Sequence, residues 1–266
     1  MCTLIVANRL FERVALLVAA NRDERLGRPA GPPALRQPAA PGGPAILAPR
    51  DLQAGGTWLG VNAAGVFAAV VNRAEVPHEP GRRSRGLLVL DALGQRSAHQ
   101  GAAQAAAWEA SAHNGFCLLV ADATQAWLVA GDGREQVQVQ RLEPGWHVVT
   151  ERSRDAGAPQ ARQRLLAERL SPLAARGPDE AVRSLRALLA EHGAGGLDGV
   201  CVHAPGLDYG TRSASVLRLG SGRTAAPPCW WHAEGPPCCT RWRDLSPLLV
   251  RLLGEQPARA QGPRQA

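Results

Sequence analysis

The chain of 266 residues contains no lysine, and all 30 of its basic side chains are arginines. This absence excludes any mechanism that uses a lysine Schiff base or a lysine general base. A formal net charge of +7 favours anionic ligands. The arginines are scattered, however, and form no stripe with interleaved aromatic residues, so we predict that nucleic acid is not a partner.

Long apolar runs and regularly spaced cysteines are also missing. No apolar stretch approaches the roughly 20 residues that cross a bilayer, and no cationic leader precedes the first apolar run. The six cysteines show neither a disulfide framework nor the spacing of a zinc motif. No glycine-rich dinucleotide fingerprint is present. We therefore predict a cytoplasmic protein with no transmembrane segment, no metal and no cofactor, and the alanine- and arginine-rich composition indicates a bacterial source.

Short apolar runs rich in β-branched residues predict strands, and alanine- or leucine-rich stretches predict helices. The expected strands cover residues 3–7, 14–20, 57–61, 66–71, 115–121, 126–131, 136–141, 146–150, 199–203, 213–219 and 229–233. The expected helices cover residues 82–94, 99–110, 160–170, 178–189 and 245–253. Residues 28–49 are rich in proline and glycine and are expected to be irregular. This order of elements predicts an α+β protein with two stacked, mostly antiparallel sheets flanked by helices.

Cys2 is the strongest candidate for a catalytic residue. Methionine is normally removed when the second residue is small, and removal of Met1 would leave a thiol and a free α-amine on one terminal residue. Such a residue can act as nucleophile while its own amine, with a reference pKa of about 8, serves as the general base. No separate histidine is then needed.

The tetrapeptide Asn21-Arg22-Asp23-Glu24 ends the second expected strand. If residues 3–7 and 14–20 form an antiparallel hairpin, these polar groups surround the thiol of Cys2. Asp23 would then hold or orient the terminal ammonium, and Arg22 would bind a carboxylate or lower the pKa of the thiol. The alternative is an ordinary polar cluster where a strand ends in a turn.

Three later features are further candidates. Gly55 and Gly56 precede an expected strand that contains Trp58, and such glycines permit a close backbone approach or a positive φ. Asn72 ends an apolar strand, where its amide could donate to an oxyanion. Arg212 precedes another strand, and its guanidinium suits a carboxylate or a phosphate. The alternatives are an ordinary strand-ending asparagine and a surface arginine.

A metal or haem site is a weaker hypothesis. Cys201 and His203 place two soft ligands on one face of an expected strand, and His232, Cys238 and Cys239 follow later in the chain. No spacing among them matches a zinc motif, so the prediction remains that no metal is bound.

Three motifs together resemble the NRDE family, which is the family of the transport and Golgi organisation protein 2. They are the start Met1-Cys2-Thr3, the tetrapeptide Asn21-Arg22-Asp23-Glu24 and the block from Gly55 to Asn62. Matching pieces continue as far as Trp231-His232-Ala233, and the resemblance covers about residues 2–253. It implies one domain over residues 1–253 and a four-layer αββα fold similar to that of the N-terminal-nucleophile (Ntn) hydrolases. Residues 254–266 are polar and rich in proline, glycine and glutamine, and this composition predicts a flexible tail.

That family is similar in turn to cholylglycine hydrolases and penicillin V acylases, which cleave amides with a terminal cysteine. The similarity implies roles for four residues, with Cys2 as nucleophile and base, Asp23 as the partner of its amine, Asn72 as an oxyanion donor and Arg212 as a late arginine. The remaining candidates for substrate binding are Asn21, Arg22 and Trp58.

Two departures from those enzymes bear on activity. Their early arginine lies three residues before the aspartate, whereas here Arg22 is adjacent to Asp23. Their second oxyanion asparagine corresponds to Glu151, and an ionised carboxylate would repel an oxyanion. Loss of one such donor typically costs about 10²–10³ in rate.

Two hypotheses about function follow. The leading one is an N-terminal-cysteine hydrolase or acyltransferase that acts on a small amide, ester or thioester through an acyl-enzyme. The alternative is a non-catalytic carrier that binds haem, acyl-CoA or a lipid-like ligand in the same pocket. Glu151 and the extra cysteine–histidine pairs favour the alternative.

Overall fold

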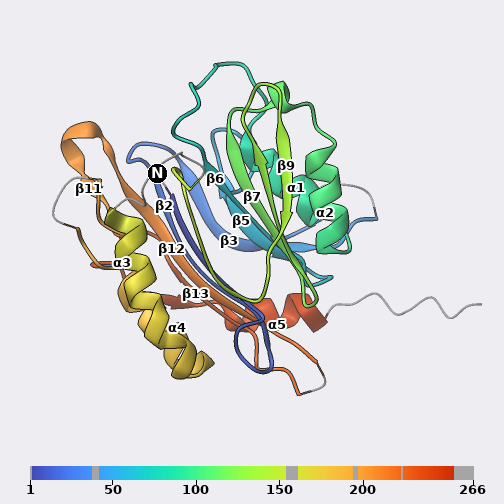
Figure 1. Cartoon of the computed structure of the whole chain (residues 1–266), viewed down its shortest axis with the longest axis vertical. Coiled ribbons are helices and arrows are strands. Elements are labelled where there is room, and N and C mark those ends of the chain that lie inside the picture. Colours follow the sequence, from blue (N-terminus) through green and yellow to red (C-terminus); the bar gives the residue numbers. More distant parts are fainter. Residues whose placement is uncertain (1, 38–41, 154–160, 194–196, 223, 255–266) are drawn as a thin grey trace, which may run out of the picture.

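Two antiparallel β-sheets lie face to face in the computed structural model of the chain (Figure 1). The structure describes residues 2–37, 42–153, 161–193, 197–222 and 224–254. The predicted tail, residues 254–266, lies outside the described residues except for Gly254. That residues 1–253 form one domain stays a prediction.

Sheet I has the strand order β10-β1-β2-β12-β13-β14, with the short β11 paired to β12. Its strands are β1 (Cys2–Asn8), β2 (Val14–Arg25), β10 (Gly145–Thr150), β11 (His203–Ala204), β12 (Tyr209–Gly220), β13 (Cys229–Ala233) and β14 (Arg243–Asp244). Sheet II is a meander in chain order from β3 to β9. Its strands are β3 (Ala30–Arg36), β4 (Ile46–Asp51), β5 (Leu59–Asn62), β6 (Phe67–Asn72), β7 (Phe116–Ala121), β8 (Ala126–Gly131) and β9 (Val137–Arg141).

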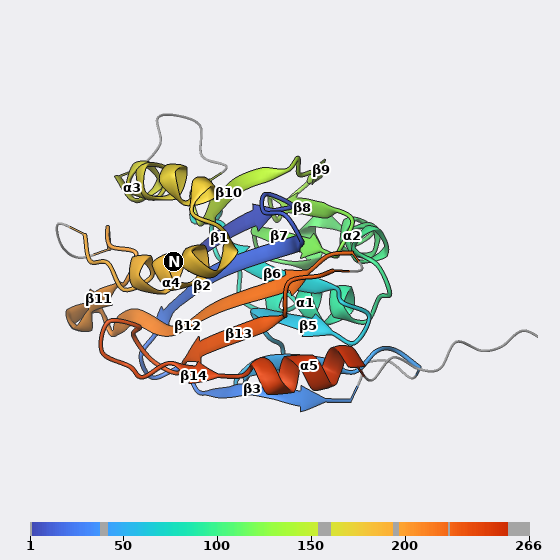
Figure 2. The ribbon, with the colours of Figure 1, turned by 90° about the horizontal axis from the view of Figure 1, so that it is seen from below.

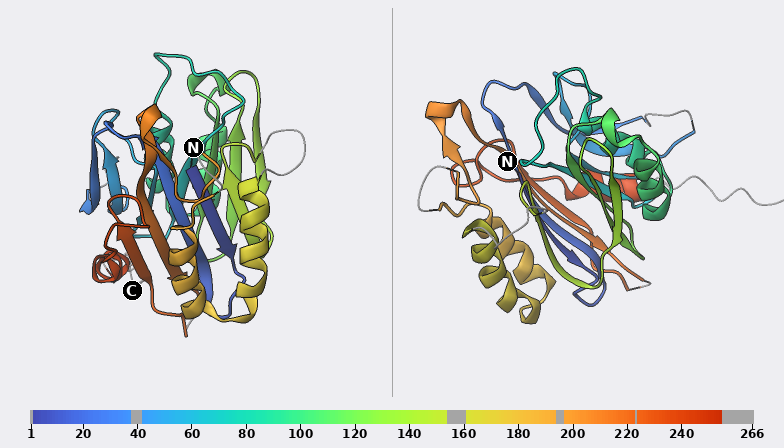
Figure 3. Two further views of the ribbon diagram at one scale, coloured as in Figure 1. Left: turned by 90° about the vertical axis from the view of Figure 1, so that its left-hand side faces the viewer. Right: turned by 45° about the horizontal axis from the view of Figure 1, so that its top comes forward.

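Helices cover the outer face of each sheet (Figure 3). On sheet II lie α1 (Arg85–Leu93) and α2 (Ala98–Ala106), and on sheet I lie α3 (Ala161–Leu170) and α4 (Pro178–Leu188). Helix α5 (Ser246–Gly254) packs beside β3 and β13 near one edge of the sheets (Figure 2). The four layers αββα confirm the predicted fold class. None of the helices in the described part of the chain is long and apolar enough to cross a membrane.

The alternation of side chains along β1 decides which way Cys2 faces. Leu4 and Val6 belong to the apolar core between the sheets, whereas Ile5 packs in the core beneath α3 and α4. Alternate residues of a strand point to opposite faces, and Cys2 therefore shares the inner face with Leu4 and packs against the same core. The candidate nucleophile lies at the end of the inter-sheet core.

The expectation that residues 28–49 are irregular is wrong, because they contain β3 and the start of β4. Strand β3 is an edge strand of sheet II, and its pairing with β4 shifts register between Gly31 and Ala34. Proline cannot donate to a ladder, and an edge strand with such an irregularity tolerates Pro32 and Pro33.

The strand expected at residues 199–203 is also wrong, since only His203–Ala204 pair as β11. The backbone of the preceding residues bonds to scattered partners instead of forming a regular ladder. The N–H of Cys201 donates to the carbonyl of Glu191, and the carbonyl of Val202 accepts from the N–H of Thr211 in β12 (both 2.9 Å). The N–H of Val202 donates to the hydroxyl of Thr211 (2.8 Å). Strand β2, by contrast, continues to Arg25 instead of stopping at residue 20, because β12 pairs along its length.

Candidate active site

The β1–β2 hairpin places Cys2 directly opposite Arg22. Both residues line a cavity of about 240 Å³. Its walls come from the start of β1, the end of β2, the β4–β5 connection, the end of β6 and the segment before α1. The hairpin predicted from the sequence is confirmed, and it sets the thiol beside the polar end of β2.

Five arginines line this cavity, and they are Arg22, Arg28, Arg82, Arg83 and Arg85. Three of the five form ion pairs with carboxylates at N–O distances of 2.6 to 2.8 Å. Arg85 instead donates to the carbonyl of Gly115 (3.1 Å), and no carboxylate of the described chain pairs with it. Three carboxylates, those of Asp23, Glu24 and Asp51, line the cavity beside the five arginines, so arginines outnumber carboxylates in a lining that suits an anionic ligand. The short cluster at residues 82–85 was visible in the sequence, but nothing in it indicated a position beside Cys2.

The Arg22 side chain is only 6% exposed. Its guanidinium carbon lies 4.3 Å from the centroid of the Trp58 ring, and Nη2 is 3.7 Å from Oε2 of Glu24. The buried Nη1 has no hydrogen-bond partner among the described residues. Burial lowers the pKa of Arg22 from its ordinary value. An unpaired buried donor costs free energy, so Nη1 is available to an oxygen of a bound ligand.

The glycines before β5 bring two backbones together beside the cavity. Gly55 has φ +77°, a left-handed conformation that favours glycine. A Cβ at Gly56 would lie 2.4 Å from the carbonyl carbon of Gly86, and the N–H of Thr57 donates to the Gly86 carbonyl (3.2 Å). Both expectations for these glycines are confirmed, because one has positive φ and the other permits close approach. The contact holds the arginine segment before α1 against the wall that carries Trp58.

The thiol of Cys2 lies 3.9 Å from the backbone carbonyl oxygen of Asp23. Burial raises the pKa of the Cys2 thiol above its ordinary value. At neutral pH the thiol is therefore protonated, and it becomes a strong nucleophile only when a base accepts its proton.

The carboxyl group of Asp23 is buried in a polar cluster. Oδ1 accepts a hydrogen bond from the Thr211 hydroxyl (2.6 Å), and Oδ2 lies 3.9 Å from Nη1 of Arg162. Burial raises the pKa of Asp23 to about 6. Asp23 follows Arg22, the residue paired with Cys2, and so lies beside the start of β1.

Arg162 is a functional candidate that the sequence reasoning missed. It comes from α3, is 5% exposed, and pairs with Glu151 (Nη1 to Oε2, 3.6 Å) as well as with Asp23. The sequence contained a signal for it. Residues 162, 166 and 170 recur at helical spacing and form the buried stripe of α3, and an arginine in an otherwise apolar stripe indicates a buried charge with a partner. Glu151, which stands where an oxyanion asparagine was expected, is thus one carboxylate of a buried ionic cluster.

The structure separates the two predicted asparagines. Asn72 lines the cavity with Cys2, and its side-chain amide has no hydrogen-bond partner in the described part of the chain. Asn21 does not line this cavity, but it lines a much smaller one of about 20 Å³ with Cys2, Arg22 and Trp58. Its Nδ2 donates to the carbonyls of Leu189 and Val200, both at 2.8 Å, so it ties β2 to the segments around α4.

Arg212 is likewise placed away from the cavity lining. It lies in β12 at a register shift between Thr211 and Ser213, and its Nη2 donates to the carbonyl of Arg28 (3.4 Å). The cavity therefore brings together five of the predicted site residues, and they are Cys2, Arg22, Asp23, Trp58 and Asn72.

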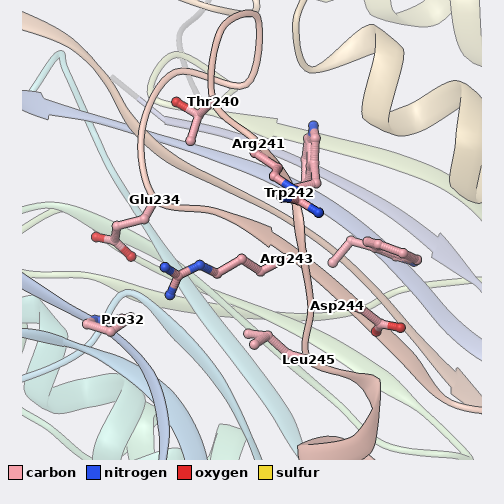
Figure 4. A pocket seen from close by; sticks show the side chains of 9 residues that line it. Pro32, Glu234, Thr240, Arg241, Trp242, Arg243, Asp244 and Leu245 are labelled. Atoms are coloured by element: carbon pink, nitrogen blue, oxygen red, sulfur yellow. The ribbon is translucent and has the colours of Figure 1, made fainter.

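A second and larger cavity, about 870 Å³, lies along β13 and β14 (Figure 4). Glu234, Thr240 and Arg243 are among its lining residues. It contains no residue of the predicted site, so the smaller cavity is the candidate active site.

Comparisons with known proteins agree with this geometry. A sequence model of the family described as Transport and Golgi organisation 2 matches residues 1–225. The Transport and Golgi organization protein 2 homolog of Bos taurus is 27% identical over 238 residues, and the match covers 76% of this chain and 81% of the bovine protein.

Two solved structures are similar in three dimensions. Penicillin V acylase from Agrobacterium tumefaciens aligns with a TM-score of 0.53 at 14% identity, covering 92% of this chain and 86% of that one. A Caenorhabditis elegans ortholog of N-acylethanolamine-hydrolyzing acid amidase aligns with a TM-score of 0.55 at 12% identity, covering 81% of this chain and 92% of that one. At these identities the likeness concerns the fold. The chain has the fold of the Ntn hydrolases and belongs to the Transport and Golgi organisation 2 family.

Proposed function

We propose that this protein is an N-terminal-cysteine hydrolase or acyltransferase that acts on a small amide, ester or thioester carrying an anionic group. One observation carries the proposal: the Cys2 thiol, the buried Arg22 guanidinium and the Asn72 amide, which bonds to no residue that the structure describes, line the same cavity. These groups are a nucleophile, an anion-binding group and an oxyanion donor, respectively.

The first half of the reaction needs a base, because burial raises the pKa of the Cys2 thiol. Removal of Met1 would supply one as the α-amine of Cys2 itself. The thiol proton passes to this amine, and the sulfur attacks the carbonyl carbon of the substrate. The carbonyl oxygen gains the negative charge, and the Asn72 amide donates a hydrogen bond to it.

In the second half, the tetrahedral intermediate collapses and the bond to the leaving group breaks. The leaving group takes the proton from the α-ammonium, and the acyl group remains on sulfur as a thioester. Water or another acceptor then attacks this thioester, and the amine accepts the proton of the attacking group. The carbon–sulfur bond breaks, the acyl product leaves, and the ammonium returns the proton to the sulfur of Cys2. A reducing compartment such as the cytoplasm would keep the thiol available, and all six cysteines are free thiols in the structure.

The substrate class follows from the charge of the cavity wall. Arg22 offers an unpaired Nη1, and Arg85 pairs with no carboxylate of the described residues. A carboxylate or phosphate on the substrate would pair with these guanidinium groups while the acyl carbon lies at Cys2.

A non-catalytic carrier that uses the same cavity is the second candidate function. It is favoured by Glu151, whose buried carboxylate pairs with Arg162 where the resembling hydrolases have an oxyanion donor. Such a protein would bind an anionic acyl compound reversibly and would not form a thioester.

The intact mass of the full-length protein, measured before and after incubation with acyl donors, tests the proposal. A matched pair of donors, an N-acylglycine and the corresponding N-acylethanolamine, differs in the anionic carboxylate. We expect loss of Met1, an acyl adduct on Cys2 and faster turnover of the anionic donor.

Two variants serve as the test and its control. Cys2→Ala should abolish both the adduct and turnover. Cys229→Ala changes a half-buried cysteine of β13 outside the cavity and should retain both. Full turnover by Cys2→Ala would exclude the proposal, whereas reversible donor binding by both variants without any adduct would establish the carrier.

A further inference from the structure

Four metal-binding side chains converge away from the candidate active site. They are His192, Cys201, His203 and Cys238. Each contributes one possible ligand atom, and these four atoms all lie within 4.8 Å of one another. Two thiols and two imidazoles are a ligand set that zinc prefers in tetrahedral structural sites.

The distances agree with the size of such a site. Bonds of about 2.3 Å to sulfur and about 2.0 Å to nitrogen, at tetrahedral angles, require separations of about 3.8 Å between two sulfurs and about 3.5 Å between sulfur and nitrogen. The Sγ atoms of Cys201 and Cys238 are 3.7 Å apart. Nε2 of His203 lies 3.5 Å from Sγ of Cys201 and 3.1 Å from Sγ of Cys238. The ring of His192 contacts that of His203 (centroids 5.1 Å apart), and its ligand atom lies within 4.8 Å of the other three.

The ligands come from three separate segments. His192 follows α4. Cys201 precedes β11 and His203 begins it, whereas Cys238 lies in the connection between β13 and β14. This distribution explains why their spacing matches no zinc motif and why the sequence predicted no metal. Cys201 is buried while the other three are exposed, so the cluster lies where an ion can enter from solvent.

We propose that this cluster binds one zinc ion in a tetrahedral Cys₂His₂ site that holds the β11 segment and the β13–β14 connection together. All four positions are occupied by side chains, as in structural sites, with none left open for a substrate. Binding releases two protons, because each thiol must ionise before its sulfur bonds to the metal, whereas the histidines bind as neutral imidazoles.

The site has a connection to the candidate active site through the segment that it fixes. The carbonyl of Val200 accepts from Asn21, and the N–H of Val202 donates to Thr211 (both 2.8 Å). Thr211 in turn donates to Asp23 (2.6 Å). Cys201 lies between Val200 and Val202. Zinc binding at Cys201 would therefore fix the backbone that positions Thr211, the hydrogen-bond partner of Asp23. The proposal does not depend on the activity proposed above.

Metal analysis of the full-length protein tests the inference directly. The chain is purified under reducing conditions without chelators, and its zinc content is measured by mass spectrometry of the elements. The metal-free protein is then titrated with Co²⁺, whose absorption reports thiolate ligands and tetrahedral geometry. We expect one zinc per chain and a thiolate-to-cobalt band that Zn²⁺ abolishes.

Variants separate this site from adventitious binding. Cys201→Ser should weaken zinc binding by more than about 100-fold, because even a lost second-shell contact costs about 10–100-fold. Cys229→Ser should bind zinc as the unaltered chain does, since it lies outside the cluster.

Three results would overturn the inference. One is a reduced, unaltered chain that takes up neither Zn²⁺ nor Co²⁺ in a one-to-one ratio. Another is a Cys201→Ser variant that is folded by circular dichroism and keeps its zinc. The third is a native Cys201–Cys238 disulfide whose reduction leaves a chain without zinc affinity.

Discussion

Arg22 has a buried guanidinium with one nitrogen that no described residue satisfies. Stacking on Trp58 fixes the plane of the guanidinium group. The N–H bonds of Nη1 lie in that plane, so their direction is fixed as well. A ligand anion is the simplest partner for it, because a charged hydrogen bond is worth about 1.5–3 kcal/mol.

Arg22→Gln should therefore raise the KM for an anionic acyl donor by about 10- to 100-fold, since each 1.4 kcal/mol is a factor of ten. Steady-state kinetics with the N-acylglycine and the neutral N-acylethanolamine measure the effect. The neutral donor should be affected little, and Arg36→Gln on β3 outside the cavity should change neither donor. An equal loss for both donors would contradict a charge-specific role.

Asp23 makes stability depend on pH, because burial raises its pKa from 3.8 to about 6. Between these values the folded state holds a proton that the unfolded chain releases. The folded state thus binds more protons, and its free energy of unfolding falls as the pH rises through this window.

Asp23→Asn removes this titration. Urea unfolding at several pH values should show the stability of the unaltered protein, relative to Asp23→Asn, declining between about pH 4 and pH 6. A difference that stays constant or grows with pH would show that the carboxyl group titrates normally.

Helix α4 stabilises the fold by covering the outer face of sheet I with its apolar side. Its buried residues are Ala181, Val182, Leu185 and Leu188, a stripe at helical spacing that packs on the outer face of sheet I. The carbonyl of Leu189, just after the helix, accepts from Asn21 of β2. The helix thus supports the strand that carries Arg22 and Asp23.

Leu185→Ala should lower the free energy of unfolding by about 2–5 kcal/mol, because it leaves a cavity in the outer core. Val250→Ala on α5 is the control, since Val250 is 53% exposed and its loss should cost under about 0.5 kcal/mol. Chemical denaturation of both variants checks the contrast. Similar losses would mean that α4 contributes little to the core.

Across the whole molecule, Arg162 links the outer helical layer to two strands of sheet I. From α3 it reaches Asp23 on β2 and Glu151 just after β10. Two buried carboxylates near each other repel, and the guanidinium between them offsets this repulsion.

Arg162→Met should therefore destabilise the fold by about 3–5 kcal/mol, as expected when a buried ionic group loses its partner. Arg169→Met on the same helix removes an exposed pair with Glu191 and should cost under about 1 kcal/mol. Adding Glu151→Gln to Arg162→Met should recover part of the loss in denaturation measurements. Equal effects of the two arginine variants would contradict the role of the buried cluster.

Much of the fold and part of the candidate site were predictable from local patterns. The period-2 runs identified the β1–β2 hairpin, and the hairpin by itself set Cys2 opposite Arg22. The polar residues at the end of β2 suggested that the strand ended at residue 20. The strand continues to Arg25 because β12 pairs with it, and this pairing is not visible in the local sequence pattern. Asn21 shows the same limit, because its amide serves the packing of α4 instead of the cavity.

The sequence by itself determined most of the strands, the helices and the chemistry available at Cys2, since these depend on neighbours along the chain. The edge strand β3, with its prolines, was not among them. Only the tertiary structure decided that Arg85 lines the cavity with Cys2, that Arg162 pairs with Glu151, and that His192 meets Cys238. Each of these contacts joins segments far apart in the sequence. They are set by how two sheets stack and where helices dock, which depends on the summed burial of many apolar side chains and not on the spacing of the few polar ones.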